Sequence, residues 1–479
     1  VVGYIGHVID VAVDDDPVLS LPWMRNGRSG LERGMDVRLR GRSGRLRLEV
    51  DARGHIVQVV DRVEPVAGSD VVTTLDGALQ ERVLDRLAGT RRAAAVVMDV
   101  HTGEIVAMAS IPSWDPGSIV EGLSDEAWSR LANAPDDPLV NRAISGLYPP
   151  GSTFKMVTAL AALEAGTVRP HESIRCAGHF TLAGHRFRCW KRSGHGPRDM
   201  LGALRESCDV YFYELARRTG IDAIAAMARR LGFGQIFECG LDLQKPGVVP
   251  GPDWKVGRFG RGWVAGETIL AGIGQGYVLA NPLQLAVMAA RIATGKAVSP
   301  TLVAGARNKQ DRDRAGELAG AIDLQSAMPA TNSPPDLSIS AQALSVVRQG
   351  MFACVNDAGG TGWRAQFEDA SVKIAGKTGT SQISRASSRR RHAALRWAER
   401  DHALFVAYAP AHSPRYAVAT VIEHGGSGGT TAAPIARDIL AAALERDPAA
   451  RPVFSPRATG GMNAREPGQT GRTDKGEAG

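Results

Sequence analysis

Long hydrophobic runs, internal repeats and an extreme charge are all absent from this chain of 479 residues. No apolar stretch approaches the roughly 18 residues of a membrane-spanning helix, which excludes a polytopic membrane protein. Glycine and proline are plentiful, with 55 and 26 residues, but they follow no period, so collagen and repeat architectures are excluded. Hydrophobic residues make up 44% of the chain and charged residues 22%, which excludes a mainly disordered protein.

Basic residues exceed acidic residues only slightly, with 57 Lys and Arg against 50 Asp and Glu and a formal net charge of +7. The arginines gather in two segments, 25–53 and 385–400, which could meet an anionic polymer or lipid. No aromatic platform accompanies them, so we predict no nucleic-acid partner. For 385–400, a solvated loop and a contact with glycan or a partner protein both remain open.

The apolar patterning predicts an α+β fold: an antiparallel sheet flanked by helices, with an inserted all-α lobe. Strands are expected at both ends of a long helical middle, over 93–98, 105–109, 372–375, 403–408 and 416–422. Helices are expected over 77–87, 151–166, 200–218, 221–231, 282–294, 340–355 and 432–446.

The same patterning predicts three parts along the chain. Residues 1–65 read as short strands, with Val37, Leu39, Leu46, Leu48 and Val50 in a half-buried alternation, and they are too few to hold a core alone. Residues 66–450 form the main domain, with a polar looped insert at about 305–337. Residues 451–479 are predicted to be disordered. Because the chain begins with Val1 in strand-like sequence, we expect a segment upstream of it.

Ser152 and Lys155 form a Ser-x-x-Lys pair in the first turn of a helix that follows Pro149-Pro150-Gly151. Residues three apart share a helix face, so the amine lies beside the hydroxyl. A serine needs a base to become a nucleophile, and an amine in an apolar helix can serve as that base. Taken alone, the pair is better explained as a capping serine and a surface lysine, because Ser-x-x-Lys occurs often by chance.

Two further segments give the pair a context. Lys377-Thr378-Gly379-Thr380 follows a short strand, where bare glycine backbone allows a peptide to pair as an added strand. Lys377 would attract a substrate carboxylate, and the Thr380 amide would complete an oxyanion hole with the Ser152 amide. Ser207 and Asp209 open a helix and either relay protons to Lys155 or cap that helix.

In the order Ser-x-x-Lys, Ser-x-Asp and Lys-Thr-Gly, the three motifs resemble the serine penicillin-recognising enzymes. The stretches Tyr-Pro-Pro-Gly-Ser-Thr-Phe-Lys, Glu-Ser-Cys-Asp-Val-Tyr-Phe-Tyr, Gly-Ile-Gly-Gln-Gly and Gly-Lys-Thr-Gly-Thr-Ser-Gln narrow the resemblance to class B penicillin-binding proteins, in particular the elongation-specific penicillin-binding protein 2 branch. Asp209, where most relatives carry Asn, agrees with that branch. Gly30-Leu31-Glu32 resembles the pedestal, a dimerisation-type domain, of which residues 1–65 would be a remnant.

The resemblance implies a transpeptidase fold and peptidoglycan D,D-transpeptidation, in which Ser152 is acylated by a D-Ala-D-Ala stem peptide or by a β-lactam. It implies catalytic roles for Lys155, Ser207, Asp209, Lys377, Thr378, Gly379 and Thr380. The implied partners are membrane proteins of an elongation complex, including a glycosyltransferase. The implied location is the periplasm, with an N-terminal helix upstream of Val1 as the anchor in the inner membrane. No organic cofactor is expected.

The cysteine spacing predicts a metal site that the resemblance does not supply. Cys176, Cys189, His195 and Cys208 lie within 33 positions and match the Cys3His ligand set of structural zinc. A Cys176–Cys189 disulfide and free thiols are the alternatives. His171, His179 and His185 lie nearby as substitutes for His195.

Two other functions are the alternatives to a transpeptidase. A β-lactam-hydrolysing enzyme would need a carboxylate and a water positioned for deacylation. The second alternative is a non-catalytic role as a β-lactam sensor or a scaffold, and the intact Ser152, Lys155 and Lys377 argue against a loss of catalysis.

Overall fold

The computed structural model describes residues 1–8, 17–120, 123–304, 334–383 and 395–448. The expected disordered tail and nearly all of the expected insert lie outside these residues, as do residues 385–394 of the second arginine segment. Within the described ranges, no helix combines the length and the apolarity that a membrane crossing requires.

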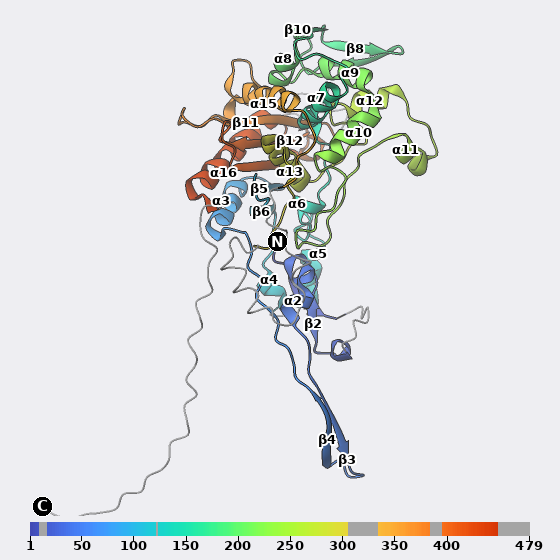
Figure 1. The fold of residues 1–479 in the computed structure, drawn as a ribbon, viewed down its shortest axis with the longest axis vertical. Coiled ribbons are helices and arrows are strands. Elements are labelled where there is room, and N and C mark those ends of the chain that lie inside the picture. Colours follow the sequence, from blue (N-terminus) through green and yellow to red (C-terminus); the bar gives the residue numbers. More distant parts are fainter. Residues whose placement is uncertain (9–16, 121–122, 305–333, 384–394, 449–479) are drawn as a thin grey trace, which may run out of the picture.

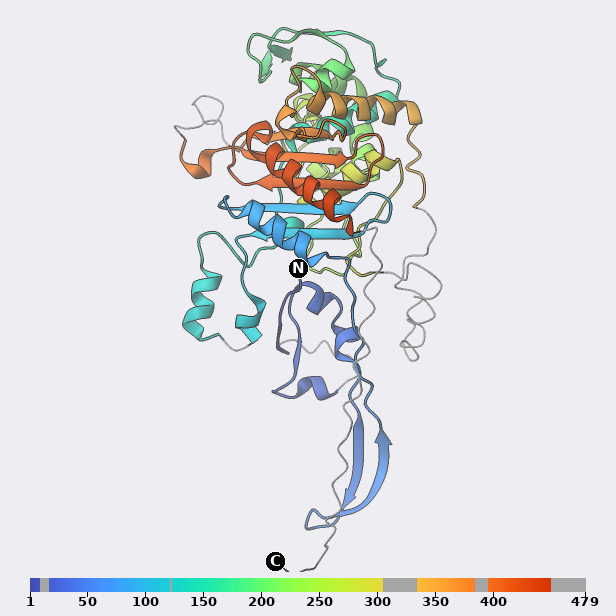
Figure 2. The same cartoon turned by 90° about the vertical axis from the view of Figure 1, so that its left-hand side faces the viewer.

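A five-stranded antiparallel sheet forms the centre of the molecule (Figures 1 and 2). The strand order is β11-β12-β13-β5-β6, so the first strands along the chain pair with the last ones. The strands are β5 (Ala93–Asp99), β6 (Ile105–Ile111), β11 (Ala375–Ser381), β12 (His402–Ala409) and β13 (Tyr416–Ile422). In this sheet β11 lies at an edge.

Helices cover both faces of the sheet, and the alternation of β5 divides the core between them. Ala93, Ala95 and Val97 pack toward α3 (Gly77–Leu87) and α16 (Ala433–Arg446). Ala94, Val96 and Met98 belong to the larger core that contains α13 (Pro282–Thr294). A strand buried on both faces reads as a continuous apolar run, and the sequence of β5 has that character.

Most of the remaining helices form the predicted lobe, above and to the right of the sheet in Figure 1. Its helices are α7 (Lys155–Glu164), α8 (Met200–Arg205), α9 (Asp209–Thr219), α10 (Ile221–Arg230), α11 (Pro252–Phe259), α12 (Ala265–Ala271) and α15 (Ala341–Asn356). Short strands β7 (Ile174–Cys176), β8 (His179–Leu182), β9 (His185–Arg188) and β10 (Gly196–Arg198) cap it. Shorter helices are α4 (Pro116–Val120), α5 (Asp125–Ala132) and α6 (Arg142–Ser145). The predicted α+β fold with an antiparallel sheet flanked by helices is confirmed, but the inserted lobe is not all-α, because it also contains β7 to β10.

The N-terminal part projects from the body (Figure 2). It contains β1 (Ile5–His7), β2 (Arg25–Gly27), α1 (Gly30–Gly34), α2 (Asp36–Arg40), β3 (Arg45–Val50) and β4 (Ile56–Val63). Leu31 enters the main core, and Arg33 Nε lies 3.1 Å from Asp242 Oδ2. The N-terminal segment, which is too short to hold a core alone, therefore packs against the rest of the chain.

Three local predictions were wrong. Val37 and Leu39 lie in α2 rather than in a strand, since Asp36 and the arginines around them begin and end a short helix. The β3 strand exists, but its side chains are exposed rather than half-buried in the described chain, because only β4 pairs with it. The strand expected at 372–375 is instead β11, which begins at Ala375. The Lys-Thr-Gly motif therefore lies within the strand and not after it.

Candidate active site

Gly151–Phe154 form a 3-10 turn, η2, that leads directly into α7 and brings Ser152 against β11. Gly151 has a φ of +54°, and a Cβ at this position would lie 2.7 Å from the carbonyl oxygen of Thr380. Only glycine permits both the left-handed backbone and this close approach. The sequence analysis expected one helix over 151–166, whereas the tighter first turn is what places the half-buried Ser152 beside the Lys-Thr-Gly strand.

Lys155 is fully buried at the start of α7, and its ammonium meets three acceptors. Its Nζ lies 2.7 Å from Asp209 Oδ1, 2.9 Å from the Ser207 carbonyl oxygen and 3.2 Å from Ser207 Oγ. The structure thus brings the first and second motifs together. The sequence analysis expected Ser207 and Asp209 to act on Lys155, although they lie 52 and 54 positions away, but it did not predict the Ser207 backbone carbonyl as an acceptor.

A break between α8 and α9 presents these acceptors. The single helix predicted over 200–218 ends at Arg205, Ser207 adopts a φ of +54°, and Cys208 precedes the first turn of α9. The Cys208 amide donates to the carbonyl oxygen of Ala203, which closes the turn. As a result, the Ser207 carbonyl and the Asp209 carboxylate face Lys155, while the Cys208 sulfur joins a separate cluster.

Lys377 on β11 is also fully buried, and its environment connects the third motif to the first two. The pKa of Lys377 is lowered to about 8, mainly by burial and to a smaller extent by the nearby Lys155 charge, while Cys354 and Asp209 act in the opposite direction. Thr378 is buried and Thr380 is exposed. Gly379 keeps the strand bare where Thr153 and Pro150 approach it. The four predicted β11 residues therefore line one side of the site.

Sequence reasoning missed residues that support this arrangement. Thr361 Oγ1 lies 2.8 Å from Thr378 Oγ1 and 3.3 Å from Cys354 Sγ. Trp190 donates its backbone N–H to Asp209 Oδ2 at 2.9 Å, and its indole N–H is shared between the carbonyl oxygens of Ser207 at 3.0 Å and Glu206 at 3.1 Å. Neither Thr361 nor Trp190 lies in a recognisable motif. The position of Trp190 directly after a candidate metal ligand was the one feature of the sequence that could have indicated its role.

A buried ion-pair network holds the segment that leads into Ser152. The Tyr148 hydroxyl donates to Glu423 Oε1 at 2.8 Å, and Arg142 Nε donates to the same oxygen at 3.0 Å. Desolvation and the Glu423 charge raise the pKa of Tyr148 far above its usual value, so the phenol keeps its proton to donate. The network ties 142–151 to the end of β13, beside the active site.

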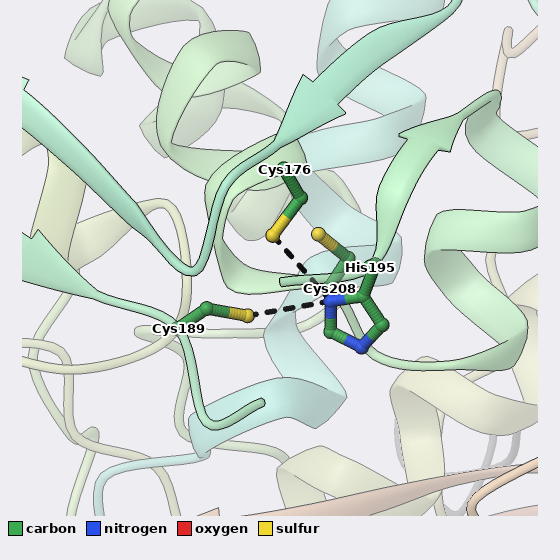
Figure 3. A group of neighbouring side chains, drawn as sticks. All are labelled: Cys176, Cys189, His195 and Cys208. Atoms are coloured by element: carbon green, nitrogen blue, oxygen red, sulfur yellow. Dashed lines mark hydrogen bonds between the residues drawn. The ribbon is translucent and has the colours of Figure 1, made fainter. Parts of the chain in front are cut away.

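The four predicted metal ligands converge behind the second motif (Figure 3). Their ligand atoms all lie within 4.8 Å of one another, and all four side chains are buried. His195 Nδ1 lies 3.5 Å from the sulfurs of both Cys176 and Cys189. Tetrahedral zinc with ordinary Zn–S and Zn–N bonds would place such atoms about 3.6 Å apart, so the spacing fits this ion.

The protonation of the cluster also suits a metal. The Cys208 thiol hydrogen-bonds to the Cys189 sulfur, and this contact lowers the pKa of Cys189 to about 2 and raises that of Cys208. Thiolate is the form that binds metal. None of the five cysteines forms a disulfide, so the Cys176–Cys189 disulfide does not occur in this structure.

Comparisons with known proteins agree with the geometry. Residues 93–441 match the penicillin binding protein transpeptidase domain, which is most of the chain. The chain belongs to this family. Residues 1–73 match the penicillin-binding protein dimerisation domain. Together with the individual relatives, these matches confirm the predicted resemblance to class B penicillin-binding proteins of the penicillin-binding protein 2 branch.

Individual relatives lie within the same branch. The chain is 37% identical over 419 residues to the peptidoglycan D,D-transpeptidase MrdA of Salmonella typhimurium strain LT2, a match that covers 86% of this chain and 65% of that protein. The chain therefore spans slightly less than two thirds of this relative. Pseudomonas aeruginosa PBP2, solved in complex with WCK 5153, aligns with a TM-score of 0.75 and 35% identity over 92% of this chain and 88% of that one. Helicobacter pylori PBP2, solved with MreC, aligns with a TM-score of 0.78 and 29% identity over 93% and 77% of the two chains.

Proposed function

We propose that this chain is a peptidoglycan D,D-transpeptidase of cell-wall elongation that works through a serine acyl-enzyme. The observation that carries the proposal is the convergence of Lys155 with Ser207 and Asp209 while Gly151 packs against Thr380 of β11. Ser152, the nucleophile, directly follows Gly151. A nucleophile, a base and a strand whose N–H groups can stabilise an oxyanion therefore lie in one place. The names of the relatives favour the same reaction.

In the acylation step, Ser152 Oγ attacks the carbonyl carbon between the two D-Ala residues of a donor stem peptide. The neutral amine form of Lys155 takes up the hydroxyl proton and becomes the ammonium, with the Ser207 hydroxyl 3.2 Å from Nζ as a relay. Backbone N–H groups of Ser152 and Thr380 stabilise the oxyanion. The peptide bond then breaks, and the terminal D-Ala leaves with a proton on its amine.

In the second step, an amine of a neighbouring stem peptide attacks the ester carbonyl. It loses a proton to the site, the ester bond breaks, and Ser152 regains its hydroxyl. The edge position of β11 supports this scheme, because an extended donor peptide can add to the open side of that strand. Lys377, Thr378 and Gly379 would meet the donor there, with Lys377 opposite its terminal carboxylate.

Penicillin labelling tests the reaction class. We expect a fluorescent penicillin to label the wild-type chain once and Ser152→Ala not at all, with the adduct on the peptide that contains Ser152. The half-life of that adduct separates a transpeptidase from a β-lactam-hydrolysing enzyme, since hydrolysis would release the label within seconds. An unlabelled wild type would leave only a scaffold role, and a rapidly cleared label would identify a hydrolase.

We further propose that Cys176, Cys189, His195 and Cys208 hold a structural zinc ion. Four protein ligands leave no open position, so the ion would fix the α8–α9 break from behind and take no part in the chemistry. The expected result is one zinc per chain by elemental analysis, and a lower melting temperature after chelation. Cys176→Ser should lose the metal, whereas Cys239→Ser, at a buried cysteine outside the cluster, should keep it. Absence of metal from the untreated wild type would refute the proposal.

The proposed partners are membrane proteins of an elongation complex, including a glycosyltransferase, with the reaction on the periplasmic side of an inner-membrane anchor. The Helicobacter relative bound to MreC supports such an assembly. The β3–β4 hairpin offers exposed apolar side chains for contacts, including Leu46, Val50, Ile56 and Val59. Deleting the hairpin tip should weaken co-purification of these partners without preventing penicillin labelling.

A further inference from the structure

Three side chains form a hydrogen-bonded chain that ends at the Lys-Thr-Gly strand. Cys354 Sγ lies 3.3 Å from Thr361 Oγ1, and Thr361 Oγ1 lies 2.8 Å from Thr378 Oγ1. Cys354 is fully buried in the last turn of α15, Thr361 lies in the loop that follows this helix, and Thr378 lies on β11. The chain of contacts therefore leads from the protein interior to the strand where the donor peptide is proposed to bind.

Backbone hydrogen bonds hold Thr361 in the middle of this chain. Its N–H donates to the Arg205 carbonyl oxygen at 3.2 Å, and the N–H of the next residue, Gly362, donates to the Cys354 carbonyl oxygen at 2.8 Å. These bonds fix the loop on both sides of the Thr361 side chain. The Thr361 hydroxyl thus has a defined place between Cys354 and Thr378.

The direction of the protons along the chain decides what Thr378 can offer to a ligand. A hydroxyl has one proton to donate and two lone pairs that accept. Within the described ranges, Thr361 is the one hydrogen-bond partner of both the Cys354 sulfur and the Thr378 hydroxyl. If Cys354 donates to Thr361 and Thr361 donates to Thr378, the Thr378 proton is left for a ligand. In the opposite direction, the buried thiol proton has no acceptor among the described residues, and Thr378 presents only lone pairs.

The first direction is the one that suits an anionic ligand. Thr378 is 7% exposed and directly follows Lys377, which the proposed function places opposite the terminal carboxylate of the donor peptide. A hydroxyl that already accepts one hydrogen bond becomes a stronger donor, because hydrogen bonds in a chain polarise one another. An O–H bond to a carboxylate is in addition charge-assisted.

We propose that Cys354 and Thr361 are positioning residues that orient the Thr378 hydroxyl as a donor to the terminal carboxylate of the donor stem peptide. This inference rests on the proposed transpeptidase function and deepens it, because it identifies how the protein orients a group that recognises the carboxylate. It also gives a role to a buried thiol that takes no part in acyl transfer.

Two peptide boronic acids test the inference on the full chain. Both bond reversibly to Ser152, and they differ only where the terminal carboxylate of the donor would lie: one carries a carboxylate and the other a carboxamide. Their inhibition constants are measured at neutral pH by competition with fluorescent penicillin, and the ratio of the two constants is the carboxylate preference. A change that only disturbs packing weakens both inhibitors and leaves this preference unchanged.

Thr361→Val keeps the shape of the side chain and removes its hydroxyl, so we expect the carboxylate preference to fall about fivefold, as for the loss of one hydrogen bond. Thr361→Ser keeps the hydroxyl and should retain most of the preference. Thr90→Val is the control, because it removes a hydroxyl that bonds to the Leu87 carbonyl oxygen at the end of α3. Thr361→Val with the wild-type preference would overturn the proposal. If this variant does not fold, Thr361→Ala replaces it.

Cys354→Ala should lower the preference by a smaller factor, about twofold, because a thiol is a weak donor. Cys239→Ala, at another buried cysteine, should keep the wild-type preference. An unchanged preference in Cys354→Ala would overturn the part assigned to the thiol. A wild type with no carboxylate preference would overturn the whole inference while penicillin labelling stands, whereas a wild type that penicillin does not label would refute the proposed function itself.

Discussion

Lys155 Nζ and Asp209 Oδ1 form a 2.7 Å ion pair in which the lysine side chain is fully buried and the carboxylate is 13% exposed. A buried pair of this kind adds little net stability, because both ions lose their hydration. It does fix the ammonium at one place among otherwise apolar neighbours of α7. The ion pair therefore serves to position the Lys155 ammonium. The other oxygen of the Asp209 carboxylate, Oδ2, accepts a hydrogen bond from the Trp190 backbone N–H.

Asp209→Asn should slow acylation by a penicillin about tenfold or more. Lys155 and the Trp190 amide both donate to the carboxylate, whereas an asparagine amide accepts through one atom only and so leaves one donor unpaired. Second-order acylation constants measure the effect. Asp222→Asn, at an exposed position in the first turn of α10, is the control and should match the wild type. Equal constants for Asp209→Asn and the wild type would contradict the role of the carboxylate.

Gly151→Ala should reduce acylation strongly, because its Cβ would lie 2.7 Å from the Thr380 carbonyl and would push η2 away from β11. The left-handed φ of +54° adds about 1–2 kcal/mol of backbone strain. Gly166→Ala is a matched control. Gly166 has a φ of +65°, but a Cβ added there would meet no atom within 4 Å, so the control should lower the melting temperature without slowing acylation. Similar rates in both variants would show that the close approach is unimportant.

The catalytic motifs could be located from the sequence because their chemistry is local: Ser152 and Lys155 lie one helical turn apart, and β11 contains four adjacent motif residues. The metal ligands could be located for a similar reason, since three cysteines and a histidine within one short polar segment match the ligand set of structural zinc. The antiparallel sheet was expected from the apolar runs toward both ends of the chain, whereas its strand order was not predicted.

The rest depends on contacts between distant residues. The break at Ser207 was missed because the apolar periodicity of 200–218 continues through it, and only the tertiary partners, Lys155 and the cluster, stabilise the positive φ. The burial of Arg142 beside Glu423 could not be inferred from residues 281 positions apart. The alternation at Val37 and Leu39 fits a strand and a short amphipathic helix equally well over five residues.

His402 predicts a loss of stability in mild acid. Its Nδ1 accepts a hydrogen bond from the backbone N–H of His424 at 2.9 Å. The pKa of His402 is lowered to about 4, mainly by burial and less by the charge of His424, while Glu423 acts in the opposite direction. Since the unfolded chain binds more protons between about pH 6.5 and pH 4, the free energy of unfolding should fall as pH decreases through that window, by at most about 1.4 kcal/mol per pH unit from this group.

Denaturant unfolding at several pH values measures this slope. His402→Gln keeps an acceptor for His424 but cannot titrate, so its slope should be shallower by up to one proton. His185→Gln, at an exposed position on β9, should retain the wild-type slope. An unchanged slope in His402→Gln would show that another group causes the acid sensitivity.

Lys377 predicts that penicillin acylation weakens above about pH 8. The pKa of its amine is lowered to about 8, first by burial, and only the charged amine attracts the carboxylate of the β-lactam. The acylation constant should therefore fall about eightfold between roughly pH 7.5 and pH 9. Stability should move the other way, because the unfolded chain binds more protons between about pH 8 and pH 10.5, so this group raises the free energy of unfolding as pH rises. Lys377→Arg stays charged throughout, so its acylation should be slower but flat over this range. The same decline in Lys377→Arg would mean that a different group titrates.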